Sequence, residues 1–83
     1  MIQLVKLGSL KKGAQARIVS VGASSEAIVR NLLEMGLIEG GIVRVVHEAP
    51  WGGDPIAVEV RGALIALRRD EAASVLVEEV SNE

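Results

Sequence analysis

The sequence Ile-Ala-Val-Glu-Val-Arg-Gly-Ala-Leu-Ile-Ala-Leu-Arg occupies residues 56–68 and decides the fold of this chain. Residues 56–61 and 63–68 each alternate between two sets of side chains, which is the pattern of a β-strand with one buried face. Only Arg61 and Gly62 connect the two strands, and so short a connection is typical of a tight hairpin in which Gly62 adopts a positive φ. The stretch therefore predicts a β-hairpin.

Short apolar stretches on both sides of this hairpin extend the sheet. They predict further strands at residues 14–21, 42–48 and 75–80, the last after a polar turn at residues 69–71. Glycines lie between most of these stretches, as turn signals do in small β domains. We expect five short strands in all.

One segment breaks the β pattern. In residues 25–35, Ile28, Leu32 and Met35 recur at helical spacing. Ser24 or Ser25 suits the N-cap, and a glycine follows at the position of a left-handed C-cap. The sequence thus predicts a single domain over residues 1–83, mainly β with one short inserted helix, in which the strands form a small barrel.

The composition excludes most catalytic chemistry. The chain is 49% hydrophobic, yet Trp51 is its one aromatic residue, His47 its one histidine, and it has no cysteine. The lack of cysteine excludes a thiolate nucleophile, a disulfide framework and a cysteine-type zinc site. We expect that the protein is not an enzyme. The lack of cysteine and of a long apolar run predicts a cytoplasmic protein that does not insert into the membrane.

The charge argues against a nucleic-acid partner. Eleven acidic residues against nine basic ones give a formal net charge of −2, whereas nucleic-acid binders gain affinity from a basic excess. Aromatic residues for base stacking are also nearly absent. A small nucleic-acid-binding barrel stays only as a lesser alternative, based on residues 11–13, Lys-Lys-Gly, before the first long strand.

Several motifs occur in a recognisable order. They are Leu-Leu-Glu-Met-Gly-Leu at 32–37, Glu-Gly-Gly at 39–41, Ala-Pro-Trp-Gly-Gly-Asp-Pro-Ile at 49–56, Val-Glu-Val-Arg-Gly at 58–62 and Ile-Ala-Leu-Arg at 65–68. Together they resemble the FeoA family, ferrous iron transport protein A, from about residue 7 to residue 80. The resemblance implies a small five-stranded SH3-like β-barrel with a helix inserted after the first long strand.

The resemblance also implies a partner. FeoA proteins accompany FeoB, a GTP-dependent membrane iron permease, so the expected function is an accessory or regulatory one in ferrous iron uptake through contact with the cytoplasmic part of that permease. The alternative is an SH3-like module that binds or senses a divalent metal. The sequence leaves the oligomeric state open. It departs from the common family pattern at Trp51, where leucine is frequent, and at Ala63, where tyrosine is frequent.

The loop Pro50-Trp51-Gly52 is the first candidate for partner binding. No strand pattern buries Trp51. The ring either folds back over one end of the barrel or anchors an interface, where tryptophan is enriched among hot spots. Both interpretations stay open, and the high apolar content favours a surface that a partner covers.

Charged residues supply two further candidate surfaces. Arg61, Arg68 and Arg69 gather around the predicted hairpin and suit an acidic partner surface, although a solvated rim is the more common explanation of such residues. The polar side of the predicted helix is the other surface; it comprises Glu26, Arg30, Asn31 and Glu34.

Metal binding is the weakest hypothesis. His47 and Glu48 are the candidate ligands for Fe²⁺ or Zn²⁺, with Asp54 and Glu59 nearby in the sequence. However, His47 and Glu48 are adjacent on a strand, so they point to opposite faces. We expect a surface histidine and no required cofactor.

Overall fold

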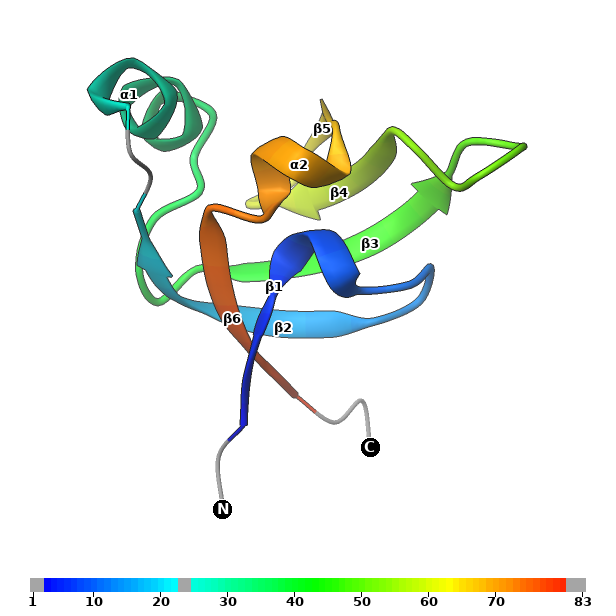
Figure 1. Cartoon of the computed structure of the whole chain (residues 1–83). Coiled ribbons are helices and arrows are strands. Elements are labelled where there is room, and N and C mark those ends of the chain that lie inside the picture. The colour runs from blue at the N-terminus through cyan, green and yellow to red at the C-terminus, as the bar shows by residue number, and fades with distance from the viewer. Residues whose placement is uncertain (1–2, 23–24, 81–83) are drawn as a thin grey trace.

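The computed structural model describes residues 3–22 and 25–80, which form one antiparallel sheet of six strands in the order β1-β6-β2-β3-β4-β5 (Figure 1). The strands are β1 (Leu4–Lys6), β2 (Gln15–Val21), β3 (Ile42–Glu48), β4 (Ile56–Val60), β5 (Ala63–Leu67) and β6 (Val75–Glu79). The helical elements are a 3-10 turn η1 (Leu7–Ser9), α1 (Glu26–Glu34) and α2 (Arg69–Ala72).

The sheet curls but does not close. Its edges are β1 and β5, and β2 and β3 run through its middle (Figure 1). The register shifts between Ile18 and Ser20 in β2 and between Val45 and His47 in β3. Such bulges bend a strand and increase its twist, which lets a single sheet wrap around its own core.

The core is aliphatic throughout, as the composition requires. Alternate residues of β4 are buried, and so are Val43 and Val45 of β3. Leucines outside the sheet cover the ends of the core: Leu7, Leu10, Leu32 and Leu37 are 0–3% exposed. The alternation that predicted the hairpin is therefore confirmed by burial.

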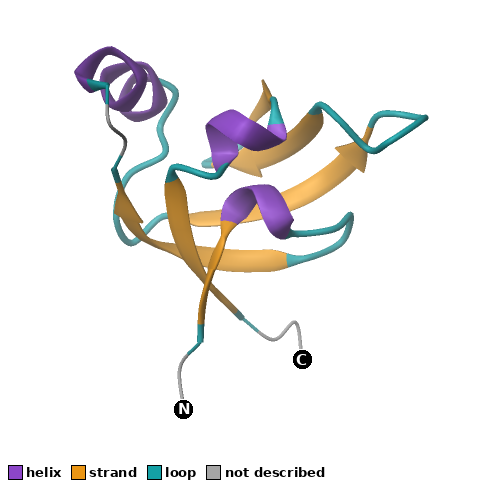
Figure 2. Ribbon diagram, in the orientation of Figure 1, coloured by secondary structure: helices purple, strands orange, loops and turns teal. Residues whose placement is uncertain are grey.

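The inserted helix lies at one end of the molecule, away from most of the sheet (Figure 2). Ser25 caps it, since its Oγ accepts a hydrogen bond from the backbone N–H of Ile28 at 3.5 Å; the other cap candidate, Ser24, lies outside the described residues. Gly36 follows with φ 100°, as expected for a left-handed cap. Within α1, Leu32 is the buried residue.

The predicted class, mainly β with an inserted helix, is confirmed, while two details differ. The sheet has six strands instead of five because residues 4–6 pair with β6; three residues are too few for periodicity to reveal. The turn expected at residues 69–71 is the helix α2. Its first N–H groups are satisfied by Asp54 Oδ1, which accepts from Arg69 at 2.9 Å, and by Glu71 Oε1, which accepts from Arg68 at 3.0 Å. The capping by Asp54 is a tertiary contact that a local pattern cannot show.

Gly8 in η1 packs directly against α2, and this contact gives a first prediction. A Cβ at Gly8 would lie 2.3 Å from the carbonyl oxygen of Arg69, so Gly8→Ala must push η1 and α2 apart. We expect Gly8→Ala to lower the unfolding free energy by about 2–3 kcal/mol in urea denaturation. Gly22→Ala is the matched control, because no atom of the described chain lies within 4 Å of the added Cβ. Equal stabilities for the two variants would contradict the close contact.

Candidate functional site

The loop between β3 and β4, residues 49–55, extends beyond the sheet as an arm on the side of the molecule opposite α1 (Figure 1). Trp51 lies on this loop and its side chain is 95% exposed. The ring therefore does not fold back over the barrel end, and that interpretation of Trp51 is wrong. Trp51, Gly52 and Gly53 have φ values of 57°, 92° and 69°. This run of left-handed conformations turns the chain sharply at the tip.

Arg69 of α2 holds the base of this loop in place. Its Nε donates a hydrogen bond to the carbonyl of Gly53 at 2.8 Å, and its Nη2 donates to Glu48 Oε2 at 2.6 Å. Its Nη1 donates to the carbonyls of Gly8 and Leu10, each at 2.8 Å. One guanidinium thus joins the loop, the end of β3 and the segment after β1. Sequence reasoning placed Arg69 on a solvated rim, and that placement is wrong, since its side chain is 23% exposed and donates four hydrogen bonds.

Two further contacts fix the loop. Asp54 Oδ1 accepts from the backbone N–H of Arg69, and the backbone N–H of Ala49 donates to the carbonyl of Pro55 at 3.0 Å. The peptide bond between Asp54 and Pro55 is cis. The loop base is therefore tied at both ends, and Trp51 is presented from an ordered support.

The two proposed metal ligands do not form a site. Glu48 Oε2 accepts a hydrogen bond from Arg69, and Glu48 Oε1 accepts one from the backbone N–H of Lys12 at 3.1 Å. Both oxygens of this carboxylate therefore take part in the contacts at the base of the loop. His47 is exposed on the neighbouring position of β3. No group of three or more His, Asp or Glu side chains suited to a metal occurs in residues 3–22 and 25–80. The donor set does not fit a resident metal ion.

This geometry predicts the result of a metal titration. We expect His47→Ala to leave the Fe²⁺ and Zn²⁺ affinity of the protein unchanged within about a factor of two, because a lone exposed imidazole binds such ions weakly. Anaerobic isothermal titration calorimetry of both proteins measures this. Tight stoichiometric binding that His47→Ala abolishes would restore the metal hypothesis.

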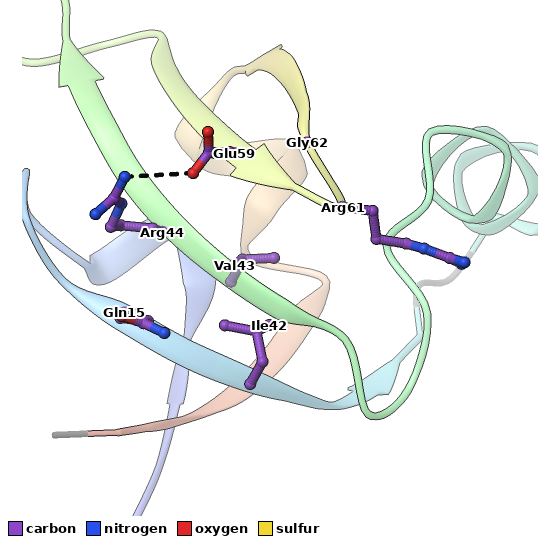
Figure 3. A pocket seen from close by; sticks show the side chains of 7 residues that line it. All are labelled: Gln15, Ile42, Val43, Arg44, Glu59, Arg61 and Gly62. Carbon is purple, nitrogen blue, oxygen red and sulfur yellow. Dashed lines mark hydrogen bonds and ion pairs between the residues drawn. The ribbon is translucent and has the colours of Figure 1, made fainter. Parts of the chain in front are cut away.

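Arg61 lies beside a shallow hollow of about 280 Å³ between β2, β3 and the β4–β5 turn (Figure 3). Within the hollow, Arg44 Nη2 and Glu59 Oε1 form an ion pair at 3.3 Å, while the side chain of Arg61 points away from them (Figure 3). Arg68, at the far end of β5, is also exposed. Among the described residues no ion pair includes Arg61 or Arg68. The structure therefore separates these two arginines from each other by the length of β5.

The α1 surface differs from the expected one. Glu26, Arg30, Asn31 and Glu34 are exposed as expected, but large apolar side chains next to them are also 38–45% exposed: Ile28, Leu33, Met35 and Ile38. Periodicity placed Ile28 and Met35 on the apolar stripe of the helix, and a helix usually buries the whole of such a stripe. Here α1 contacts little besides β2, so it buries only the centre of that stripe.

Comparisons with known proteins agree with this architecture. The FeoA domain profile matches residues 5–79. The Fe(2+) transport protein A/Fe(2+) transporter FeoB fusion protein of Porphyromonas gingivalis is 35% identical over 78 residues, which are 94% of this chain and 9% of that protein. The chain thus corresponds to a small part of that relative.

Solved structures are similar over most of the chain. The solution structure of the FeoA protein from Chlorobium tepidum is 38% identical with a TM-score of 0.83, covering 95% of this chain and 73% of that one. FeoA of Stenotrophomonas maltophilia, crystallised with zinc and described as an SH3 domain protein, is 37% identical with a TM-score of 0.78, covering 88% of each chain. The fold is therefore SH3-like.

No helix in the described residues is long and apolar enough to cross a membrane. The family match covers residues 5–79, and strands β2 to β6, the inserted helix and the loop that carries Trp51 all fall within it. This chain belongs to the FeoA domain family.

Proposed function

We propose that this protein is an accessory factor of ferrous iron uptake that binds the cytoplasmic part of a FeoB-type permease through the loop of residues 49–55. The observation that carries the proposal is Trp51, 95% exposed on a loop that Arg69 and Asp54 hold in place. The fusion of an FeoA-type region to FeoB in the P. gingivalis relative supports the choice of partner.

The energetics of Trp51 support an interface. A buried tryptophan removes about 150–250 Å² from water, and at about 25 cal/mol per Å² this corresponds to about 4–6 kcal/mol before the costs of association. The isolated domain gains almost none of this free energy, because the Trp51 side chain is 95% exposed. The ordered loop base also lowers the entropy that binding must remove. A pre-positioned aromatic residue is the usual form of a binding hot spot.

The proposed mechanism is regulation by docking. The described residues offer no metal cluster and no phosphate-binding loop of the kind that nucleotide chemistry needs, so we assign neither GTP hydrolysis nor iron transfer to this domain. Docking changes the permease only as far as the domain binds one permease conformation more tightly than another. FeoA of S. maltophilia was crystallised with zinc, but residues 3–22 and 25–80 of this chain contain no group of three or more His, Asp or Glu side chains that could hold a metal ion, and the proposal includes no metal.

A capture experiment tests the proposal. Immobilised wild-type protein is incubated with detergent-solubilised membranes of the organism that encodes it, and captured proteins are identified by mass spectrometry. The proposal expects recovery of the iron permease with the wild type and little recovery with Trp51→Ala. Recovery of no iron permease by the wild type would contradict it.

A further inference from the structure

The two edges of the sheet differ in how they are protected. β1 has three residues and ends in the charged Lys6, and short length and lysine both hinder the pairing of an edge with another chain. β5 has five residues, Ala63–Leu67, all apolar, and pairs with β4 without a register shift. β5 therefore lacks the charge, proline or bulge that normally blocks an edge strand.

Backbone geometry identifies the free groups of β5. The connecting residues Arg61 and Gly62 have φ values of 53° and 82°, as in the two-residue hairpin turn of type I′. The residues that flank such a turn exchange both hydrogen bonds, and the pattern then alternates along the strand. The N–H and C=O groups of Leu64 and Ala66 consequently point away from β4. No hydrogen bond among the described residues outside the strand ladders reaches these groups.

The side chains of the same two residues are exposed. Leu64 is 69% exposed, which among the large apolar side chains described is exceeded only by Trp51. Ala66 is exposed on the same face, whereas Ile65 packs against the core and Leu67 is buried. The edge thus offers free backbone groups and apolar side chains at the same positions.

The charges at the two ends of β5 specify what fits there. Arg61 precedes the strand and Arg68 follows it, both exposed and outside the ion pairs of the described residues. Each of the nearby carboxylates has a partner: Glu59 pairs with Arg44, Glu71 accepts from the backbone N–H of Arg68, and Asp70 accepts from the backbone N–H of Glu71. An apolar edge with a cation at each end is complementary to an apolar strand with an anion at each end.

We propose that β5 takes up an extended segment of a partner protein as an additional antiparallel strand, with apolar residues opposite Leu64 and Ala66 and a carboxylate near each end. Main-chain hydrogen bonds would supply the affinity and the flanking arginines the selectivity, as in other cases of strand addition. The inference holds for whichever protein supplies the segment, so it is independent of the assignment of the permease.

A second copy of this chain fits the edge less well. Antiparallel pairing of two β5 strands that joins Leu64 of one copy to Ala66 of the other would bring Arg61 of one copy near Arg68 of the other. Like charges in adjoining positions destabilise such a pair. Charge complementarity therefore favours a different, acidic partner segment.

Peptide titrations followed by ¹⁵N NMR test the proposal directly. The probe is the capped peptide Glu-Thr-Val-Thr-Val-Thr-Thr-Glu, in which the two valines face Leu64 and Ala66. The matched controls are the same peptide with lysine in place of both glutamates, and one with N-methyl groups on both valines. We expect the acidic peptide to shift the amide signals of Leu64 and Ala66 and to bind at least about tenfold more tightly than either control, about 1.4 kcal/mol or more.

Protein variants provide the reciprocal test. Ala66→Pro removes an N–H that points outward, a change that edge strands tolerate, and it should reduce acidic-peptide binding about tenfold or more while the unfolding transition is retained. The double variant Arg61→Glu, Arg68→Glu should prefer the lysine-flanked peptide. Leu33→Lys, at an apolar site on α1, should bind like the wild type.

Three outcomes would overturn the inference. They are no binding by the acidic peptide at millimolar concentration, equal binding of acidic and basic peptides, and a wild-type dimer in sedimentation velocity that Ala66→Pro dissociates. The last result would assign β5 to self-association.

Discussion

Replacement of Arg69 by alanine is expected to lower the unfolding free energy by about 2–4 kcal/mol. The substitution removes hydrogen bonds to the carbonyls of Gly53, Gly8 and Leu10 and leaves the half-buried Glu48 without its cationic partner. Each kcal/mol corresponds to about 4–8 °C in the melting temperature of a domain of this size. Thermal and urea unfolding followed by circular dichroism measure the loss.

Two controls separate the bonding geometry of Arg69 from its charge. Arg69→Lys keeps the positive charge but cannot reproduce the planar guanidinium, so it should lose more than half as much stability as Arg69→Ala. Arg17→Ala removes another arginine with a carboxylate partner, Glu78 at 2.8 Å, but the arginine side chain is 44% exposed. That change should cost less than about 1 kcal/mol. Similar losses for Arg17→Ala and Arg69→Ala would refute the central position of Arg69.

Replacement of Trp51 by alanine is expected to weaken binding of the permease by about 30-fold or more, the effect of a hot spot worth about 2 kcal/mol. The same variant should unfold within about 0.5 kcal/mol of the wild type, because a side chain that is 95% exposed contributes little to the fold. The ratio of the two effects is the diagnostic quantity. Binding is measured by biolayer interferometry and stability by urea denaturation.

The matched control for Trp51→Ala is Leu33→Ala. Leu33 is 45% exposed on α1, at the opposite end of the molecule from the loop of residues 49–55 (Figure 1). This variant should keep the wild-type affinity. A stability loss of about 3–5 kcal/mol in Trp51→Ala would instead place the ring in the core.

Much of the fold follows from the sequence because the burial pattern of each long strand is local. Val58 and Val60 alternate with Ala57 and Glu59 both in the sequence and in burial, and a two-residue connection leaves the hairpin few alternatives. The helix could be predicted in the same way, from the spacing of its apolar residues and from its cap at Ser25. These features depend on residues within about one turn or one strand of each other.

The features that sequence reasoning missed depend on long-range contacts. Arg69 looked like a rim residue because its partners, Glu48, Gly53 and Gly8, are 16–61 positions away. Its place in an Arg-Arg pair just after the apolar stretch of residues 63–67 was the only signal. For Trp51, the sequence left two interpretations open, and the 95% exposure of its side chain excluded the one in which the ring folds back over the barrel end.

The sequence also did not predict that β5 is an edge strand. The sequence predicted a small barrel that could be open or closed, and only a closed barrel has no edges; the strand order shows that the sheet stays open at β5. Arg61 and Arg68 were singled out as contacts for an acidic surface, and the structure places between them an apolar strand with free backbone groups. Their contact with a partner stays a prediction.

The most direct measurement is calorimetric titration of the purified cytoplasmic part of the FeoB-type permease into this protein and into Trp51→Ala. The account predicts saturable binding by the wild type, weakened about 30-fold or more in the variant although both unfold at the same urea concentration. Absence of binding by the folded wild type, or equal affinity of the two proteins, would contradict it.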